Sequence, residues 1–172
     1  MELLERFALG DLEAFETLFR QFQGQMYGWI VRIVRDSGVA EDLTVETFWR
    51  IYRARARFDP AGNFGAWARR IATNIALDHL RTVRSEVELP ENLPQSRSPD
   101  PAVQRDIRER MERAFRALPV KLRVPATLAL IEEESYAEIA GALGISVGAV
   151  KLRVFRATRL LRKKLKQLGV EP

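Results

Sequence analysis

The chain has 172 residues, of which 47% are hydrophobic and 30% are charged, so it can form one ordinary globular domain or two small ones. It has no cysteine and one histidine, His79, which excludes disulfides, thiolate nucleophiles and cysteine zinc sites and argues against histidine-based metal or catalytic sites. The net charge of +5 suits a nucleic-acid partner. No apolar run spans a bilayer and no signal peptide is evident, so we expect a cytoplasmic protein without membrane insertion.

The first half of the sequence shows helical periodicity in three segments. Residues 11–35 carry apolar side chains at three- and four-residue steps, and Asp11 is placed to cap this helix. Residues 40–58 and 64–84 carry two further apolar stripes, and residues 59–63, Asp-Pro-Ala-Gly-Asn, predict a loop between them. The positions expected to face inward are Phe15, Leu18, Phe19, Phe22, Met26, Trp29, Ile30, Ile33, Leu43, Phe48, Ile51, Tyr52, Trp67, Ile71, Ile75 and Leu80.

A change of composition separates the two halves of the chain. Residues 85–104 hold half of the chain's eight prolines, and helix cannot run through such a segment. These prolines are Pro90, Pro94, Pro99 and Pro101. We therefore predict an all-α protein of two small helical domains, residues 1–84 and 105–172, joined by a flexible proline-rich linker over 85–104.

The second half contains a pattern of helix, tight turn and helix. Ser135 is placed to cap the first helix, and Glu138 three residues later completes a capping box. Ala140 is small where two crossing helices must approach closely, and Gly144 can adopt the left-handed conformation that ends a helix. Ser146 is placed to cap the second helix. This is the spacing of a helix-turn-helix, whose second helix enters the major groove of DNA.

The second helix of this pattern, residues 146–165, is strongly basic and has no acidic residue. A solvated charged face is the ordinary explanation of such a run. The cap, the glycine turn and the small alanine at the right offsets favour DNA contact instead. Its basic residues are Lys151, Arg153, Arg156, Arg159, Arg162, Lys163 and Lys164.

Three stretches of the sequence resemble one protein family. SYAEIAGALGISVGAVKLRVFRA is similar to the promoter-binding region four of bacterial sigma factors. VAEDLTVETFWRIYR resembles the region-two helix that docks on the RNA polymerase β′ subunit, and FGAWARRIATNIALDHLR resembles the helix that reads and melts the −10 element. Two such domains and a linker are similar to the compact extracytoplasmic-function (ECF) class, so the resemblance implies a region-two helical bundle followed by a region-four helix-turn-helix.

The resemblance implies a docking surface on the segment 40–58. Asp42 and Glu46 lie one helical turn apart on one face and can receive arginines from a partner, although an ordinary solvated face would look the same. Val45 departs from the family, which often has glutamine at this position. The expected polymerase-binding residues are Glu41, Asp42, Leu43 and Glu46.

The resemblance also implies two DNA-reading sites. The loop 59–64 resembles the family's specificity loop, which captures a base flipped out of the non-template strand; Asn63 and Phe64 are either readers or structural residues, and Trp67 is expected in the core. The residues expected at the −10 element are Asn63, Phe64, Asn74, Asp78 and Arg81. The residues expected at the −35 element are Ser146, Lys151, Leu152, Arg153, Phe155, Arg156 and Arg159. Leu152 replaces a small polar residue of many relatives and can contact a thymine methyl group.

These expectations describe a sigma factor without catalytic residues, metal or cofactor. Its expected partners are core RNA polymerase, through the β′ and β subunits, and promoter DNA, both as duplex and as melted non-template strand. An anti-sigma factor is a further partner that the resemblance admits. Two alternatives are a stand-alone helix-turn-helix regulator, which would bind duplex DNA without polymerase, and an adaptor that binds polymerase without reading DNA. The adaptor has no need of the basic helix.

Overall fold

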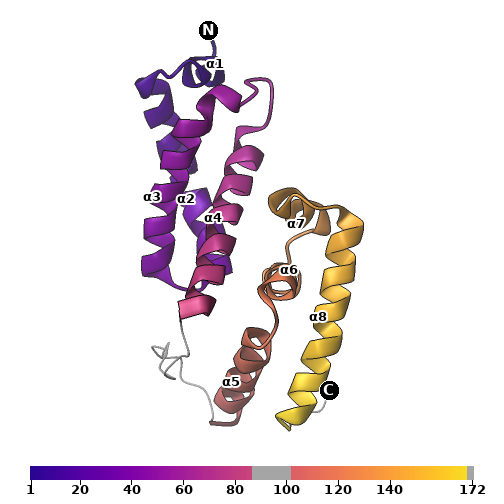
Figure 1. Ribbon diagram of the computed structural model, residues 1–172. Helices are drawn as coiled ribbons and strands as arrows, with labels where there is room; N and C mark the ends of the chain where they lie inside the picture. The colour runs from indigo at the N-terminus through magenta and orange to yellow at the C-terminus, as the bar shows by residue number, and fades with distance from the viewer. Residues whose placement is uncertain (87–101, 170–172) are drawn as a thin grey trace.

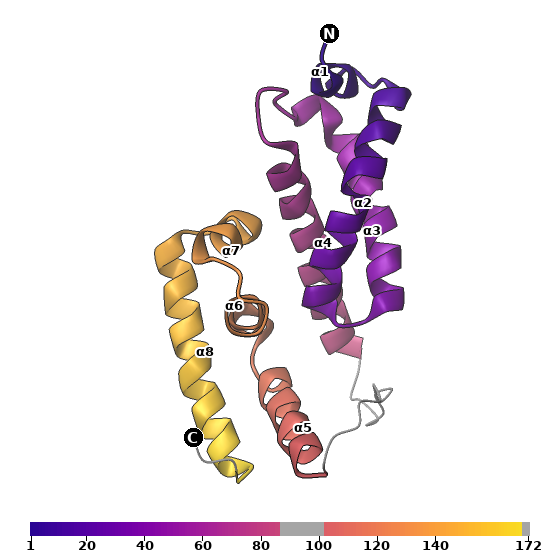
Figure 2. The ribbon, with the colours of Figure 1, turned by 180° about the vertical axis from the view of Figure 1, so that it is seen from behind.

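The computed structural model describes residues 1–86 and 102–169, which form eight α-helices, one 3-10 helix and no strand. The all-α prediction is therefore confirmed. In the first half lie α1 (Leu3–Ala8), α2 (Leu12–Val34), α3 (Ser37–Ala54), η1 (Arg55–Arg57) and α4 (Phe64–Glu86). In the second half lie α5 (Ala102–Arg116), α6 (Val120–Leu130), α7 (Tyr136–Leu143) and α8 (Val147–Gln167). Figures 1 and 2 show α1–α4 as one bundle and α5–α8 as a second group beside it.

The entry into α2 is fixed by local chemistry. The Asp11 carboxylate accepts hydrogen bonds from the backbone nitrogens of Glu13 and Ala14, as an N-cap does. Arg6 Nε donates to the same carboxylate at 2.7 Å, and this hydrogen bond lowers the pKa of Asp11 below its usual value. Gly10, at φ 91°, interrupts the helix between α1 and α2. The structure therefore has a short first helix that the sequence pattern did not predict.

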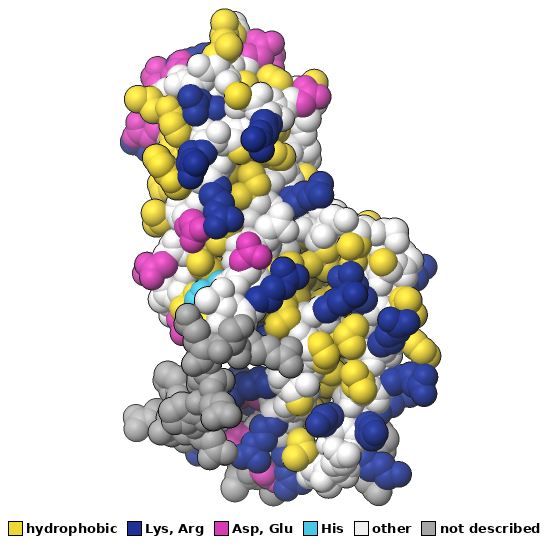
Figure 3. Space-filling view, in the orientation of Figure 1, with side chains coloured by type: hydrophobic (Ala, Val, Ile, Leu, Met, Phe, Trp, Pro, Cys, Tyr) yellow, Lys and Arg dark blue, Asp and Glu magenta, His cyan; other side chains and the backbone are white. Residues whose placement is uncertain are grey.

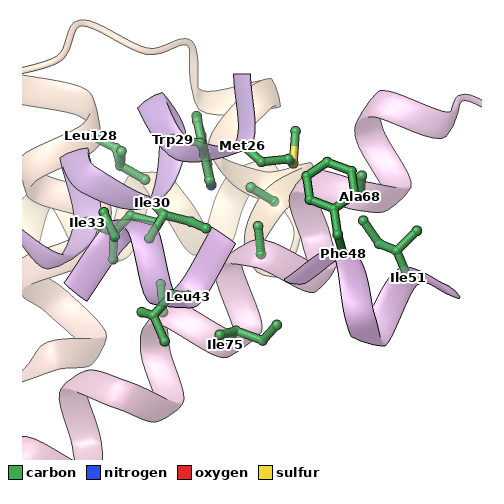
Figure 4. Packing of buried hydrophobic residues seen from close by; sticks show 14 of the residues in the cluster. Met26, Trp29, Ile30, Ile33, Leu43, Phe48, Ile51, Ala68, Ile75 and Leu128 are labelled. Carbon is green, nitrogen blue, oxygen red and sulfur yellow. The ribbon is translucent and has the colours of Figure 1, made fainter. Parts of the chain in front are cut away.

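The core of the first domain lies between α2, α3 and α4. Figure 4 shows Met26, Trp29 and Ile30 of α2 against side chains of α3 and α4, such as Phe48 and Ile75. Each of these side chains is at most 3% exposed. The three-helix pattern predicted from periodicity is therefore the pattern that forms the core.

The second domain has a small core of its own and also joins the first core. Ala114, Leu118, Ala126, Ala157 and Leu161 form a separate buried cluster between α5, α6 and α8. Other side chains of α6–α8 continue the buried cluster of the first domain. Figure 4 shows Leu128 of α6 on the side of α2 that carries Trp29 and Ile33. The two helical groups thus pack against each other.

The predicted linker, residues 85–104, lies largely outside the described residues. Where the structure does describe its ends, α4 continues to Glu86 and α5 begins at Ala102. Over the described ranges, no helix combines the length and the apolar character that a membrane span requires.

Candidate nucleic-acid interface and docking surface

Helices α7 and α8 form the predicted helix-turn-helix. Ser135 Oγ accepts a hydrogen bond from the Glu138 nitrogen at 3.2 Å, and Ser146 Oγ accepts one from the Ala149 nitrogen at 3.1 Å. Gly144 ends α7 at φ 67°, the left-handed conformation that favours glycine. The Glu138 side chain forms an ion pair with Arg69 of the first domain. It therefore does not complete the capping box that the sequence predicted.

The exposed face of α8 is both basic and apolar. Val150, Val154, Ala157 and Leu161 are buried, and they lie on the side of the helix opposite to the exposed residues. The exposed residues at the centre of this opposite face are Leu152, Phe155, Arg156 and Arg159. Figure 3 shows Lys and Arg side chains along α8 with hydrophobic side chains between them. Such a face can meet both phosphates and the edges of bases.

Phe155 is an exposed aromatic residue on this face of α8. The residue is 59% exposed, and the Arg159 guanidinium carbon lies 6.0 Å from the centroid of its ring. Lys151 is also exposed. Arg153 is only half-exposed, because it lines a cleft between the domains together with Arg81 and Lys121.

The N-cap of α8 provides a test of this local geometry. We expect Ser146→Ala to lower the free energy of unfolding by about 1 kcal/mol, because the Ala149 nitrogen loses its acceptor. Ser146→Asp keeps an acceptor and should keep the stability. Urea unfolding followed by circular dichroism measures both. Equal stability of the Ala and Asp variants would mean that the cap does not form in solution.

On α4, three of the residues expected at the −10 element share one face. Asn74, Asp78 and Arg81 are exposed and lie four and three residues apart. Arg81 Nη1 lies 3.6 Å from Asp78 Oδ1. Asn63 is exposed before the first turn, where its Oδ1 accepts a hydrogen bond from the Ala66 nitrogen at 2.9 Å.

Phe64 belongs to the core, which is the structural alternative that the sequence left open for it. Its side chain is 4% exposed and packs against the rings of Phe7, Phe22, Phe58 and Trp67. A ring enclosed on these sides has no free face for a base. Trp67, expected in the core, packs against the same cluster.

A polar pocket that sequence reasoning missed lies next to Asn63. Phe22 and Gln25 of α2 form one side, Arg69 of α4 another, and Glu138 of α7 closes it. The sequence pattern could not indicate Gln25, because it is an ordinary exposed residue of α2 until the fold brings it close to the loop.

The expected docking residues on α3 divide into exposed and buried ones. Glu41 and Asp42 are exposed, and Glu46 pairs with Arg50 at 2.5 Å. Leu43, also expected at the docking surface, is only 8% exposed and packs in the core, so in this structure it stabilises α3 from its buried side. Two exposed apolar residues lie on the same helix: Val45, 68% exposed, was noted only as a departure from the family, and Trp49, 60% exposed, was missed. Their spacing from Asp42 was the available signal.

Comparison with known proteins matches both halves of the chain to one family. Sigma-70 region 2 matches residues 18–86, and sigma-70 region 4 matches residues 108–161. The chain is 35% identical over 181 aligned residues to the RNA polymerase sigma-H factor of Pseudomonas aeruginosa, covering 97% of this chain and 94% of that protein. It is 35% identical to the ECF RNA polymerase sigma factor BldN of Streptomyces coelicolor, covering 96% of this chain and 65% of that protein.

A solved structure shares the arrangement of both domains. It is the structure of CnrH in complex with the cytosolic domain of CnrY, with a TM-score of 0.62 and 25% sequence identity over 96% of each chain. These similarities favour the family that the sequence motifs indicated over a stand-alone helix-turn-helix regulator. The chain therefore belongs to the sigma-70 family of RNA polymerase sigma factors and, within it, to the extracytoplasmic-function class.

Proposed function

We propose that this chain directs core RNA polymerase to promoters by reading the −35 element with α8 and the melted −10 element with the α4 region. The observation that carries the proposal is the helix-turn-helix whose second helix exposes Leu152, Phe155, Arg156 and Arg159 opposite its buried side. An α-helix fits the major groove, where arginine pairs with guanine and apolar groups contact the thymine methyl.

The −10 site combines a reading face with a pocket. Asn74, Asp78 and Arg81 offer donors and acceptors on α4, and the pocket beside Asn63 has an aromatic wall at Phe22. Flipping a base costs a few kcal/mol, and stacking on an aromatic ring returns about 1–3 kcal/mol. We therefore propose that the pocket receives a flipped base of the non-template strand, so that only accepted sequences melt.

We propose that the outer face of α3 binds core polymerase. Carboxylates of Glu41 and Asp42 flank the exposed Val45 and Trp49, a mixture of charge and aromatic surface that suits a protein partner. In this proposal the chain catalyses nothing, and polymerase performs the chemistry. An anti-sigma protein is a further proposed partner, because similar solved structures are of sigma factors in complex with anti-sigma factors.

Arg156 is expected to matter for promoter recognition and not for polymerase binding. Arg156→Ala should weaken binding of the polymerase complex to promoter duplex by about 1–3 kcal/mol, because one base or phosphate contact is lost. The matched control is Arg113→Ala, which removes an exposed arginine from α5. Electrophoretic mobility shift measures the DNA affinity. A loss of polymerase affinity in Arg156→Ala would contradict the proposed division of work between the helices.

The proposed function as a whole is tested by run-off transcription. Purified core polymerase transcribes a pool of random-sequence promoter fragments with and without this chain. Transcripts that require the chain support the proposal, and their upstream sequences give both elements. An absence of such transcripts, with stable binding of the chain alone to duplex DNA, would overturn it in favour of a stand-alone regulator.

A further inference from the structure

The centre of the exposed face of α8 is apolar, although the helix as a whole is basic. Gly148, Leu152, Phe155 and Arg159 follow one another at steps of three and four residues, so they form one row along the helix. At Gly148 a Cβ would meet only the Ser146 hydroxyl, at 3.9 Å, so the row begins with bare backbone. Leu152 and Phe155 are 48% and 59% exposed, more than any other large apolar residue of α8. The side chains that project from the middle of the face are therefore a leucine and a phenylalanine.

Cations flank this apolar pair instead of lying between its members. Lys151 precedes Leu152 and Arg156 follows Phe155, and neighbours in sequence point about 100° apart around a helix. Each cation therefore lies to one side of the row, and Figure 3 shows apolar side chains between cations along α8. A helix in the major groove turns the centre of its face to the base edges and its flanks to the phosphates. The cations are thus placed for phosphates and the apolar pair for bases.

One group of the major groove suits an apolar pair. Every base pair presents hydrogen-bond donors or acceptors there, and thymine adds its C5-methyl group. A leucine or a phenyl ring placed against a donor or acceptor would displace water without replacing its hydrogen bond. Against a methyl group, the same side chains bury apolar surface on both sides of the contact. 5-Methylcytosine carries its methyl group at the same ring position as thymine.

The spacing of the pair fits two such methyl groups in one element. Side chains three residues apart on a helix have Cβ atoms about 5–6 Å apart. Successive bases of one strand are about 3.4 Å apart along the DNA axis. Leu152 and Phe155 can therefore contact bases that are one or two steps apart.

We propose that Leu152 and Phe155 form a reader of 5-methylpyrimidines, which selects the −35 element by the C5-methyl groups of two nearby thymines. This inference rests on the proposed function and names the chemical group that α8 reads. Because 5-methylcytosine presents the same methyl group, it is preferred over cytosine at these two positions. Methylation of cytosine within the element therefore raises the affinity of this chain for the promoter.

Uracil substitution in a synthetic promoter tests the methyl contacts. The promoter has a sequence selected by run-off transcription, and uracil replaces single thymines in its −35 half only. Uracil keeps the base pairing and the O4 acceptor of thymine and lacks only the methyl group. We expect Kd of the polymerase complex, measured by electrophoretic mobility shift, to rise about 4-fold at each of two positions. This factor corresponds to about 0.8 kcal/mol for one buried methyl group.

Alanine variants assign each methyl contact to a side chain. Leu152→Ala and Phe155→Ala should each bind the thymine and uracil promoters equally at one of the two positions. The matched control is Leu160→Ala, which removes a 39% exposed apolar side chain of α8 that lies off the row. It should keep both 4-fold differences. At a position sensitive to uracil, 5-methylcytosine should bind the wild type about 4-fold more tightly than cytosine, and the corresponding alanine variant should lose this preference.

The outcomes separate this inference from the proposed function. Equal binding of thymine and uracil promoters would overturn the methyl reader, while transcription that depends on the chain would still support the proposed function. A uracil effect that persists in both alanine variants would also overturn the reader, because the methyl groups would then act elsewhere. If no transcript depends on the chain, the proposed function fails. The same comparison, on duplexes selected by binding to the chain alone, then decides whether the methyl contacts exist.

Discussion

Replacing Trp29 by alanine is expected to lower the free energy of unfolding by about 3–5 kcal/mol, the largest loss of stability we predict for a single substitution. The side chain is 1% exposed at the centre of the first core. Its Nε1 donates a hydrogen bond to Thr73 Oγ1 at 2.8 Å, which ties α2 to α4. The change therefore removes a large apolar volume and a hydrogen bond between two helices. Urea unfolding followed by circular dichroism at 222 nm measures the loss.

Trp29→Phe separates the ring from the hydrogen bond. Phenylalanine keeps most of the buried apolar surface, so we expect this variant to lose clearly less stability than Trp29→Ala. Arg32 and Arg69 lie over the Trp29 ring at 5.0 and 4.9 Å, so the alanine variant should also loosen the interdomain pairs that these arginines make. A loss below about 1 kcal/mol in Trp29→Ala would contradict the central position of this residue.

The features that the sequence predicted well depend on neighbours within one helical turn. Asp11, Ser135 and Ser146 cap helices as expected, because an N-cap needs only the backbone nitrogens two or three residues ahead. Gly144 ends α7 as expected, because a left-handed residue is a local requirement. The buried stripes of α2, α3 and α4 followed from helical periodicity in the same way.

The features that the sequence did not predict depend on packing between distant segments. Phe64 follows a loop signal, yet it is enclosed by rings that come from α1, α2 and the segment after η1. The sequence predicted that Glu138 would form a capping box with Ser135. Its side chain instead contacts Arg69, which lies 69 residues away in the chain. A local pattern cannot choose between such partners. The choice is made by the packing of the second domain on α2 and α4.

The outer face of α3 leads to the second large effect. Asp42, Val45 and Trp49 lie three and four residues apart, so they share one side of the helix. Trp49 is 60% exposed, and a large aromatic ring exposed beside carboxylates has the composition of a binding hot spot. We expect Trp49→Ala to weaken the affinity for core polymerase by about 2 kcal/mol or more, which is roughly 30-fold in Kd. Fluorescence anisotropy of labelled chain measures that affinity.

Leu12→Ala is the matched control for Trp49→Ala, because Leu12 is a 67% exposed apolar residue on another helix of the same domain. It should leave the affinity for polymerase unchanged. Neither substitution should change the free energy of unfolding by more than about 0.5 kcal/mol, since both residues lie at the surface. Asp42→Arg tests the charge on the same face and should weaken docking as well, because it replaces an acceptor for partner arginines by a like charge. Unchanged affinity in both Trp49→Ala and Asp42→Arg would remove α3 from the docking surface and leave its exposed tryptophan to another partner.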